Sequence, residues 1–206
     1  MKLHNLDGSA LLSRRSAMAG LTAVVAAPVL SVLPGQVLAQ TGATLTELAT
    51  LWRREGGVLL VRHAVTEAGL GDPPEFVLGQ CRTQRNLSAD GQRASRAMGE
   101  WARTNGFKPD AVRTSQWCRC QDTARLAFGQ YEDWPPLNST FAGQGNPSAQ
   151  IQALRERLLG MPAGRTEVWV THQVIMTALT GAYPEMGEGF LVDAQGRLRT
   201  RGRVAA

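Results

Sequence analysis

Two short apolar runs in this sequence each end directly at a histidine. Residues 57–62 (GVLLVR) lead into His63, and residues 167–171 (EVWVT) lead into His172. Parallel strands that are buried on both faces have such continuous apolar runs, and open α/β sheets place ligand chemistry at the carboxyl ends of their strands. The pattern therefore predicts two parallel strands whose ends bring His63 and His172 into one pocket.

The rest of the apolar pattern alternates between helical and strand-like segments. Thr44 and Glu47 form a capping box that predicts the start of a helix ending near Arg54, and Ser88 is expected to cap a second helix that ends near Asn105. Further helices are predicted over residues 117–128, 148–159 and 174–181, and strands over 58–62, 111–114, 167–171 and, at the sheet edge, 189–193. This alternation predicts an α/β fold, a three-layer α/β/α sandwich with a mostly parallel sheet.

Two segments rich in glycine and proline, residues 64–85 and 129–147, interrupt this alternation. Loops of this length in a compact domain are usually functional or flexible, and both follow elements that lead to the expected pocket. We expect them to form the pocket walls. Trp117 and Trp169 are expected to pack in the core rather than to bind substrate.

The first 39 residues have the order of an export signal. The pair Arg14–Arg15 precedes an apolar core over residues 17–33, and the segment ends in small or aliphatic residues at Ala39. This order predicts a signal, twin-arginine in type, that is cleaved near Ala39 and directs a bacterial protein to the periplasm or outside the cell. An uncleaved membrane anchor is the alternative. The predicted organisation is a signal over 1–39 and one domain over 40–206, without stable membrane insertion after cleavage.

The charge balance argues against nucleic acid as a partner. The whole chain has a net charge of +5, and residues 40–206 carry 19 basic against 16 acidic side chains. That excess is well short of a nucleic-acid-binding surface. Lys108 is the only lysine in this domain, so nearly every cation is an arginine, whose planar fork suits phosphate oxygens.

The three cysteines are Cys81, Cys118 and Cys120. An exported protein can keep a disulfide, so Cys81 could pair with either Cys118 or Cys120. A structural zinc site needs four ligands, which these cysteines do not supply. No metal and no other cofactor is predicted, and the oligomeric state is left open.

Four ordered blocks of the sequence resemble the histidine phosphatase superfamily, which has the phosphoglycerate mutase-like fold. Residues 61–66 (VRHAVT) resemble its Arg-His-Gly signature, and residues 86–91 (NLSADG) resemble its Leu-Thr-x-x-Gly helix start. Residues 114–124 (TSQWCRCQDTA) are similar to its Ser-Ser-Pro-x-x-Arg-x-x-Gln-Thr-Ala segment, and residues 170–172 to its second histidine strand.

The resemblance implies a metal-independent phosphomonoesterase that acts on a small phosphorylated substrate. His63 would attack the phosphorus, and water would then hydrolyse the phosphohistidine. Arg62 and Arg119 would clamp the phosphate, and His172 would complete the pocket, adding a further cation if it is protonated. Arg85, just before the second block, is a further candidate for substrate contact.

The sequence also departs from the family pattern. Ala64, Gln116 and Gln173 replace its usual glycine, proline and, in one branch, acidic residue. The proton donor for the leaving oxygen is therefore displaced or missing. Glu188 is the first candidate, with Glu67 and Asp72 as rivals. A phospho-ligand binding protein that has lost the acid is the main alternative function, and a phosphomutase is a weaker one.

Overall fold

The computed structural model describes the backbone of residues 35–204 and the side chains of residues 45–204. Most of the expected export signal, residues 1–34, lies outside the described residues, and so does the paired arginine motif. No helix in the described part of the chain is long and apolar enough to cross a bilayer.

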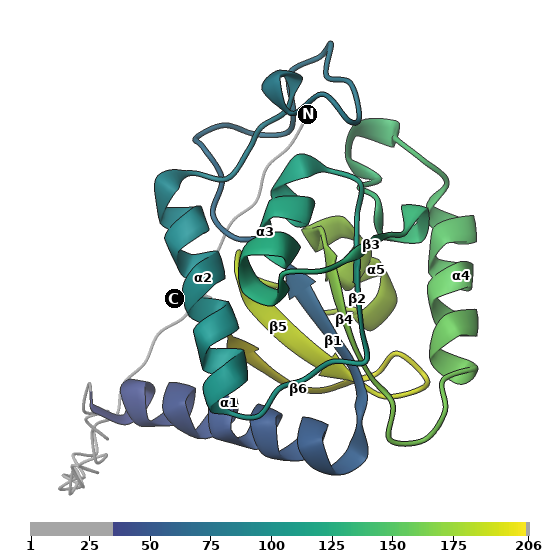
Figure 1. The fold of residues 1–206 in the computed structure, drawn as a ribbon. Coiled ribbons are helices and arrows are strands. Elements are labelled where there is room, and N and C mark those ends of the chain that lie inside the picture. Colours follow the sequence, from purple (N-terminus) through teal and green to yellow (C-terminus); the bar gives the residue numbers. More distant parts are fainter. Residues whose placement is uncertain (1–34, 205–206) are drawn as a thin grey trace, which may run out of the picture. The chain divides into compact units, whose positions relative to one another are not determined.

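One mixed sheet of six strands forms the centre of the fold (Figure 1). The strand order is β3-β2-β4-β1-β5-β6. Strands β3, β2, β4 and β1 are parallel to one another. Strand β5 is antiparallel to β1, and β6 is antiparallel to β5. The bounds are β1 (Gly57–Arg62), β2 (Ala111–Thr114), β3 (Glu132–Asp133), β4 (Thr166–Thr171), β5 (Glu188–Val192) and β6 (Leu198–Arg203).

Helices cover both faces of the sheet, which confirms the three-layer α/β/α sandwich. Helices α1, α2 and α3 pack on one face around a core that includes Trp52, Met98 and Val170. Helices α4 and α5 pack on the other face around Leu154 and Trp169. Their bounds are α1 (Gly35–Glu55), α2 (Ala89–Thr104), α3 (Cys118–Phe128), α4 (Pro147–Leu159) and α5 (Gln173–Thr180).

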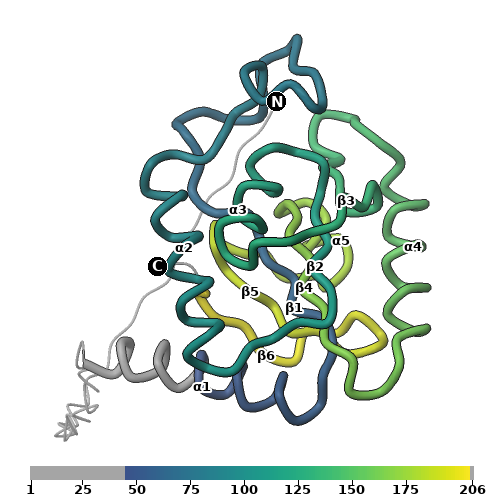
Figure 2. Tube along the Cα trace, viewed as in Figure 1, coloured from purple at the N-terminus to yellow at the C-terminus, as the bar shows by residue number. Residues whose placement is uncertain are grey.

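The register of the central strands brings the two histidines together. In the parallel pair β1–β4, Arg62 lies opposite Thr171. The next residue of each strand is a histidine, and the backbone N–H of His63 donates to the Thr171 carbonyl (3.0 Å). The loops over residues 64–88 and 129–146 rise at this same end of the sheet (Figure 2).

Local contacts fix the loop that leaves His63 against α2. The hydroxyl of Ser88 caps this helix by accepting from the Gly91 N–H (3.1 Å), as the sequence predicts. A Cβ atom on Gly91 would lie 1.9 Å from the Val65 carbonyl oxygen. Only glycine permits this close approach, so the Asn86–Gly91 block holds the segment after His63 in place.

Three sequence-based expectations about elements are corrected by the structure. Helix α1 begins at Gly35, so the Thr44–Glu47 capping box lies within it; the preceding Leu38, Ala39 and Gln40 all favour helix. Strand β5 is not at the sheet edge, because β6 pairs with its outer side. Strand β3 is too short to leave a periodic signal.

Candidate active site

His63 lies at the end of β1 with its side chain almost fully buried. Its Nδ1 atom is 2.9 Å from the Ala64 carbonyl oxygen. Because a carbonyl can only accept, Nδ1 carries the proton and Nε2 keeps its lone pair. Burial, followed by the positive charge of Arg119, lowers the pKa of His63 to about 3. The ring is therefore neutral near pH 7, which is the form that can attack phosphorus.

His172 immediately precedes α5, and its ring centroid is 5.5 Å from that of His63. The Ser115 hydroxyl lies 2.8 Å from its Nε2 atom. Burial, and then the charges of Arg119 and neighbouring groups, lowers the pKa of His172 well below its ordinary value. His172 is therefore neutral near pH 7 in this structure and does not supply the extra cation expected from the sequence. A bound phosphate dianion would favour protonation of the His172 ring.

Three arginines converge on the two histidines. Arg62 at the end of β1, Arg119 in the first turn of α3 and Arg85 before α2 line one cavity of about 130 Å³ together with His63 and His172. Among the described side chains, the buried Nε atoms of all three arginines have no hydrogen-bond partner. The three positive charges at one cavity make its wall suited to bind the oxygens of an anion.

A carboxylate already binds one of these arginines. Asp72 accepts from both terminal nitrogens of Arg119 (2.7 and 3.1 Å), from the Arg85 N–H (3.0 Å) and from Trp117 Nε1 (3.0 Å). Burial raises the pKa of Asp72, but the hydrogen bonds and charge of Arg119 outweigh that effect and hold the pKa below its ordinary value. Asp72 is therefore ionised, and it is the one carboxylate that lines the cavity among the side chains described.

The structure does not bring the other two candidate proton donors to the cavity. The carboxylate of Glu188 binds Arg201 through two hydrogen bonds (2.6 and 2.7 Å) and accepts from the Glu185 N–H (2.8 Å). Arg201 belongs to β6, which, like β3, the sequence pattern did not predict. Glu67 is exposed and does not line the cavity either.

The third sequence block supplies supporting contacts besides Arg119. Thr123 in α3 accepts from the Ala64 N–H (3.1 Å), which ties the residue after His63 to that helix. Cys120 is buried with its sulfur 3.5 Å from His172 Nε2, and burial raises the pKa of its thiol to about 12. It is therefore a neutral packing residue and not a nucleophile.

Several cavity residues leave no signal in the sequence. Tyr183 follows α5, and its ring lies 5.8 Å from the Arg62 guanidinium. Ser139, Phe141 and Gln144 come from the loop before α4. These residues lie in irregular segments, where periodicity gives no direction for a side chain. Only the general expectation that residues 64–85 and 129–147 form the pocket walls points to them, and both loops do line the cavity.

The disulfide joins Cys81 to Cys118, one of the two pairings left open by the sequence. Cys81 belongs to the loop that carries Asp72 and Arg85, and Cys118 directly precedes Arg119. The bond therefore connects the cavity loop to the first turn of α3. In addition, the side chain of Gln84 accepts from the Cys118 N–H (2.9 Å).

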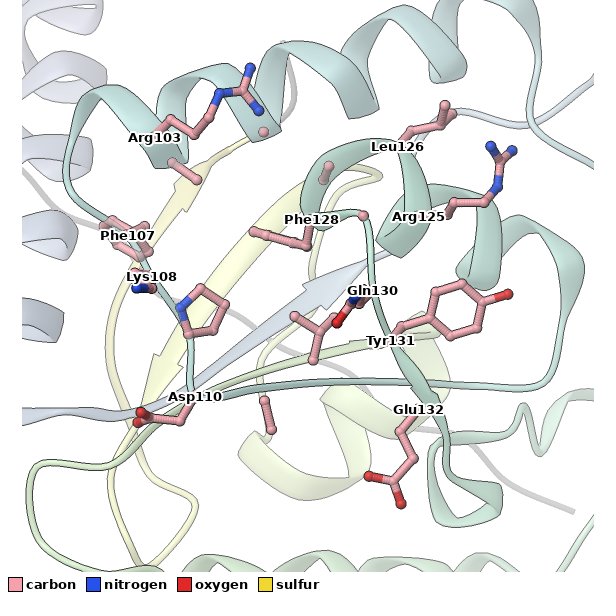
Figure 3. A pocket seen from close by; sticks show the side chains of 17 residues that line it. Arg103, Phe107, Lys108, Asp110, Arg125, Leu126, Phe128, Gln130, Tyr131 and Glu132 are labelled. Carbon is pink, nitrogen blue, oxygen red and sulfur yellow. The ribbon is translucent and has the colours of Figure 1, made fainter.

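A larger hollow of about 730 Å³ lies elsewhere, between the C-terminal ends of α2 and α3 and the beginning of β2 (Figure 3). No histidine lines it among the described residues. Its Arg125 pairs with Asp122 (2.7 Å), and its Glu132 pairs with Arg113 (3.0 Å). Its size alone does not make it the reactive site. No group of three or more potential metal ligands occurs in the described part of the chain.

Comparisons with known proteins agree with this geometry. Residues 58–144 match the family model of the histidine phosphatase superfamily, branch 1. A candidate alpha-ribazole-5'-phosphate phosphatase from Escherichia coli K-12 has a similar fold, with 17% identity and a TM-score of 0.50 over 72% of this chain and 96% of that chain. The sequence matches no curated protein at a significant level.

Two other solved structures are similar at a slightly lower level. TTHB049 from Thermus thermophilus has 19% identity and a TM-score of 0.49 over 70% of this chain and 97% of that chain. A candidate phosphohistidine phosphatase SixA from Agrobacterium tumefaciens has 15% identity and a TM-score of 0.49 over 70% and 95%. The match over residues 58–144 confirms the resemblance that the sequence blocks predict, namely to the histidine phosphatase superfamily.

Proposed function

We propose that this protein is a phosphomonoesterase that hydrolyses its substrate through a phosphohistidine on His63. The observation that carries the proposal is the hydrogen bond from His63 Nδ1 to the Ala64 carbonyl, which leaves Nε2 free beside three arginines. Phosphoryl transfer depends mainly on positioning and electrostatic stabilisation, and these side chains supply both.

The residues divide the work as follows. His63 Nε2 forms the bond to phosphorus while the bond to the ester oxygen breaks, and water then hydrolyses the phosphohistidine to phosphate. Arg62, Arg85 and Arg119, which line the cavity, donate from their guanidinium groups to the phosphoryl oxygens. His172 gains a proton as the dianion binds and donates to the same group. Because these cations are side chains, we expect turnover to be unaffected by a chelator.

The leaving oxygen must find its proton without a protonated carboxyl group. Asp72 is ionised and bound to Arg119, and Glu188 is bound to Arg201. We therefore expect aryl phosphates, which leave as stable anions, to be hydrolysed much faster than alkyl phosphates. General-acid catalysis is typically worth about 10²–10⁴-fold, which sets the scale of this difference.

Hydrolysis of p-nitrophenyl phosphate by purified variants tests the proposal. His63→Ala should abolish turnover and the acid-labile phosphoprotein adduct. Arg119→Ala should lower kcat/KM by about 10²–10³-fold, as for loss of a group that stabilises transition-state charge. Arg125→Ala, in the same helix but outside the site, is the matched control and should retain activity. Wild-type turnover by His63→Ala would refute the phosphohistidine mechanism.

One observation favours a second function. The ionised state of Asp72 leaves the cavity without a protonated carboxyl group, as expected for a phospho-ligand binding protein that has lost its acid. Such a protein would bind phosphate esters without hydrolysing even p-nitrophenyl phosphate, and the same assay separates the two functions.

We also propose that the protein acts in the bacterial periplasm or outside the cell. The disulfide between Cys81 and Cys118 supports this, because disulfides persist in oxidising compartments. The order of residues 1–39, which resembles an export signal, supports the same location. Fractionation of cells that express the full chain, with sequencing of the mature N-terminus, would test both the location and cleavage near Ala39.

A further inference from the structure

The catalytic cavity is too small to hold more than the reacting end of an ester. Its volume is about 130 Å³. Sites that enclose whole small molecules usually measure about 300–1,000 Å³. The organic part of a substrate must therefore extend beyond the cavity.

A second hollow of about 530 Å³ adjoins the catalytic cavity and shares Ser139 and Gln144 with it. It lies between the loop before α2 and the segment that leads into α4. None of the described residues that line it is charged. Its apolar lining is Phe76, Leu78, Trp117, Pro135, Pro136 and Ala149. We call this hollow the apolar groove.

Trp117 separates the catalytic cavity from the apolar groove. Its ring lies edge-on to His172 at 5.3 Å and packs against Phe76 at 5.6 Å. Its Nε1 donates to Asp72 inside the cavity (3.0 Å), so its only polar atom is satisfied away from the groove. Trp117 is therefore an apolar part of this wall, next to the polar Ser139 and Gln144 that the two hollows share.

Exposed large apolar side chains line both the apolar groove and the catalytic cavity. Leu78 in the groove is 40% exposed, and Phe141 at the cavity is 41% exposed. Each of the two hollows therefore has an exposed large apolar side chain on its wall, and exposed apolar surface is a common mark of a binding site. A sugar or nucleotide would leave its polar groups unpaired against these walls, whereas an apolar chain would remove both surfaces from water.

We propose that the apolar groove binds the organic part of an amphiphilic phosphomonoester, with an uncharged, apolar chain attached to the phosphate. This inference rests on the proposed function, since it places the phosphate at His63. The substrate then has its charge at the three arginines and its apolar chain along Phe76 and Leu78.

Binding of n-alkylphosphonates, from ethyl to octyl, tests the groove without requiring turnover. Calorimetry on the wild-type protein should show the affinity rising about fourfold for each methylene that is buried, until the groove is filled. An affinity that does not change with chain length, or no binding at all, would overturn the proposal.

Leu78→Glu gives the matched variant, because Leu78 is exposed and its replacement should not disturb folding. It should weaken octylphosphonate binding by at least tenfold and leave ethylphosphonate binding unchanged. Leu159→Glu, which alters an exposed leucine on α4 outside the groove, is the control. Equal effects of the two variants on octylphosphonate would contradict the groove.

Hydrolysis of p-nitrophenyl phosphate distinguishes failure of this inference from failure of the proposed function. If the affinity depends on chain length but no hydrolysis occurs, the groove proposal stands and the phosphatase proposal fails. If hydrolysis occurs but the affinity does not depend on chain length, the phosphatase proposal stands and the groove proposal fails.

Discussion

At the scale of single residues, Arg119 is the side chain for which two anions compete. Asp72 holds both of its terminal nitrogens, while its Nε atom has no partner among the described residues. A phosphate that binds at Arg119 must therefore lie near the Asp72 carboxylate. The negative charge that orients Arg119 also opposes the substrate.

Asp72→Asn should therefore increase the affinity for inorganic phosphate. At an effective dielectric constant of about 20, a negative charge about 4 Å from the phosphate contributes about 4 kcal/mol of repulsion, so its removal should raise the affinity at least tenfold. The affinity can be measured by competitive inhibition of p-nitrophenyl phosphate hydrolysis. Asp122→Asn, which alters the exposed partner of Arg125, is the control and should have no effect. Weaker phosphate inhibition in Asp72→Asn would mean that orientation of Arg119 outweighs repulsion.

Glu188→Gln is expected to affect stability and not the choice of leaving group. Its carboxylate receives two hydrogen bonds from Arg201, and hydrogen bonds to charged groups contribute about 1.5–3 kcal/mol each when buried. Because Arg201 is partly exposed, we expect the free energy of unfolding to fall by only about 1–2 kcal/mol in urea titrations. The ratio of aryl to alkyl phosphate turnover should stay constant. A selective loss on alkyl phosphates would restore Glu188 as the proton donor.

The sequence predicts residues whose role depends on their position along a strand or helix. Strand ends and a helix start fix the direction of His63, His172, Arg62 and Arg119, which all line the cavity. Arg85 also lines it but lies in the irregular loop before α2, where its position gives no direction. The sequence does not predict which carboxylate lies in the cavity. Several acidic residues follow the elements that lead to it, and contacts with residues distant in sequence determine which of them enters it. Arg201 binds Glu188, and β6, which carries Arg201, has too weak an apolar pattern to be predicted.

At the scale of elements, the disulfide joins the most irregular segment of the cavity to one of its helices. Residues 64–88 contain little regular structure, yet they carry Asp72 and Arg85. The Cys81–Cys118 bond holds this loop at the first turn of α3, next to Arg119. The geometry of the arginines should consequently depend on this bond.

Reduction of the disulfide should weaken both folding and phosphate binding. A cross-link between residues separated by 37 positions is worth about 4 kcal/mol in the chain-entropy account, so the Tm should fall clearly on adding dithiothreitol. Inhibition by inorganic phosphate should weaken at the same time. Cys81→Ala should behave like the reduced protein and show no further response to dithiothreitol. Wild-type inhibition after complete reduction would show that the loop keeps its place without the bond.

The strands and helices with strong periodicity were predictable, and the irregular ones were not. Strand β1, strand β4 and helix α2 follow from apolar runs and a serine cap. Strand β6 alternates Leu198, Thr200 and Gly202 with arginines, so its inward face is only weakly apolar. Its existence depends on pairing with β5, a long-range contact that local sequence does not encode.

At the scale of the whole molecule, buried titratable groups make the free energy of unfolding depend on pH. His63 has a pKa of about 3 in the folded protein, against 6.5 as its ordinary value. Burial raises the pKa of Glu167, but hydrogen bonds from Arg157, Trp169 and Arg165 outweigh it and lower the pKa to about 2. Both shifts mean that the unfolded chain binds more protons than the folded one in acid, so stability falls as the pH falls.

The contribution of His63 to the free energy of unfolding can be separated from that of the carboxylates, because the two change over different pH ranges. It is fully present above pH 6.5 and is lost as the pH falls from 6.5 towards 3, whereas that of Glu167 is lost only below its ordinary pKa of 4.5. Between pH 7.5 and pH 5, the wild-type protein should therefore lose about 2 kcal/mol more unfolding free energy than His63→Gln. Urea titrations at the two pH values measure this difference. His172→Gln should reduce the loss in the same direction, because the pKa of His172 is also lowered. If His63→Gln and the wild-type protein lost equal stability over this range, the folded protein would bind a proton at His63 as readily as the unfolded chain does, and burial would not lower the pKa of His63.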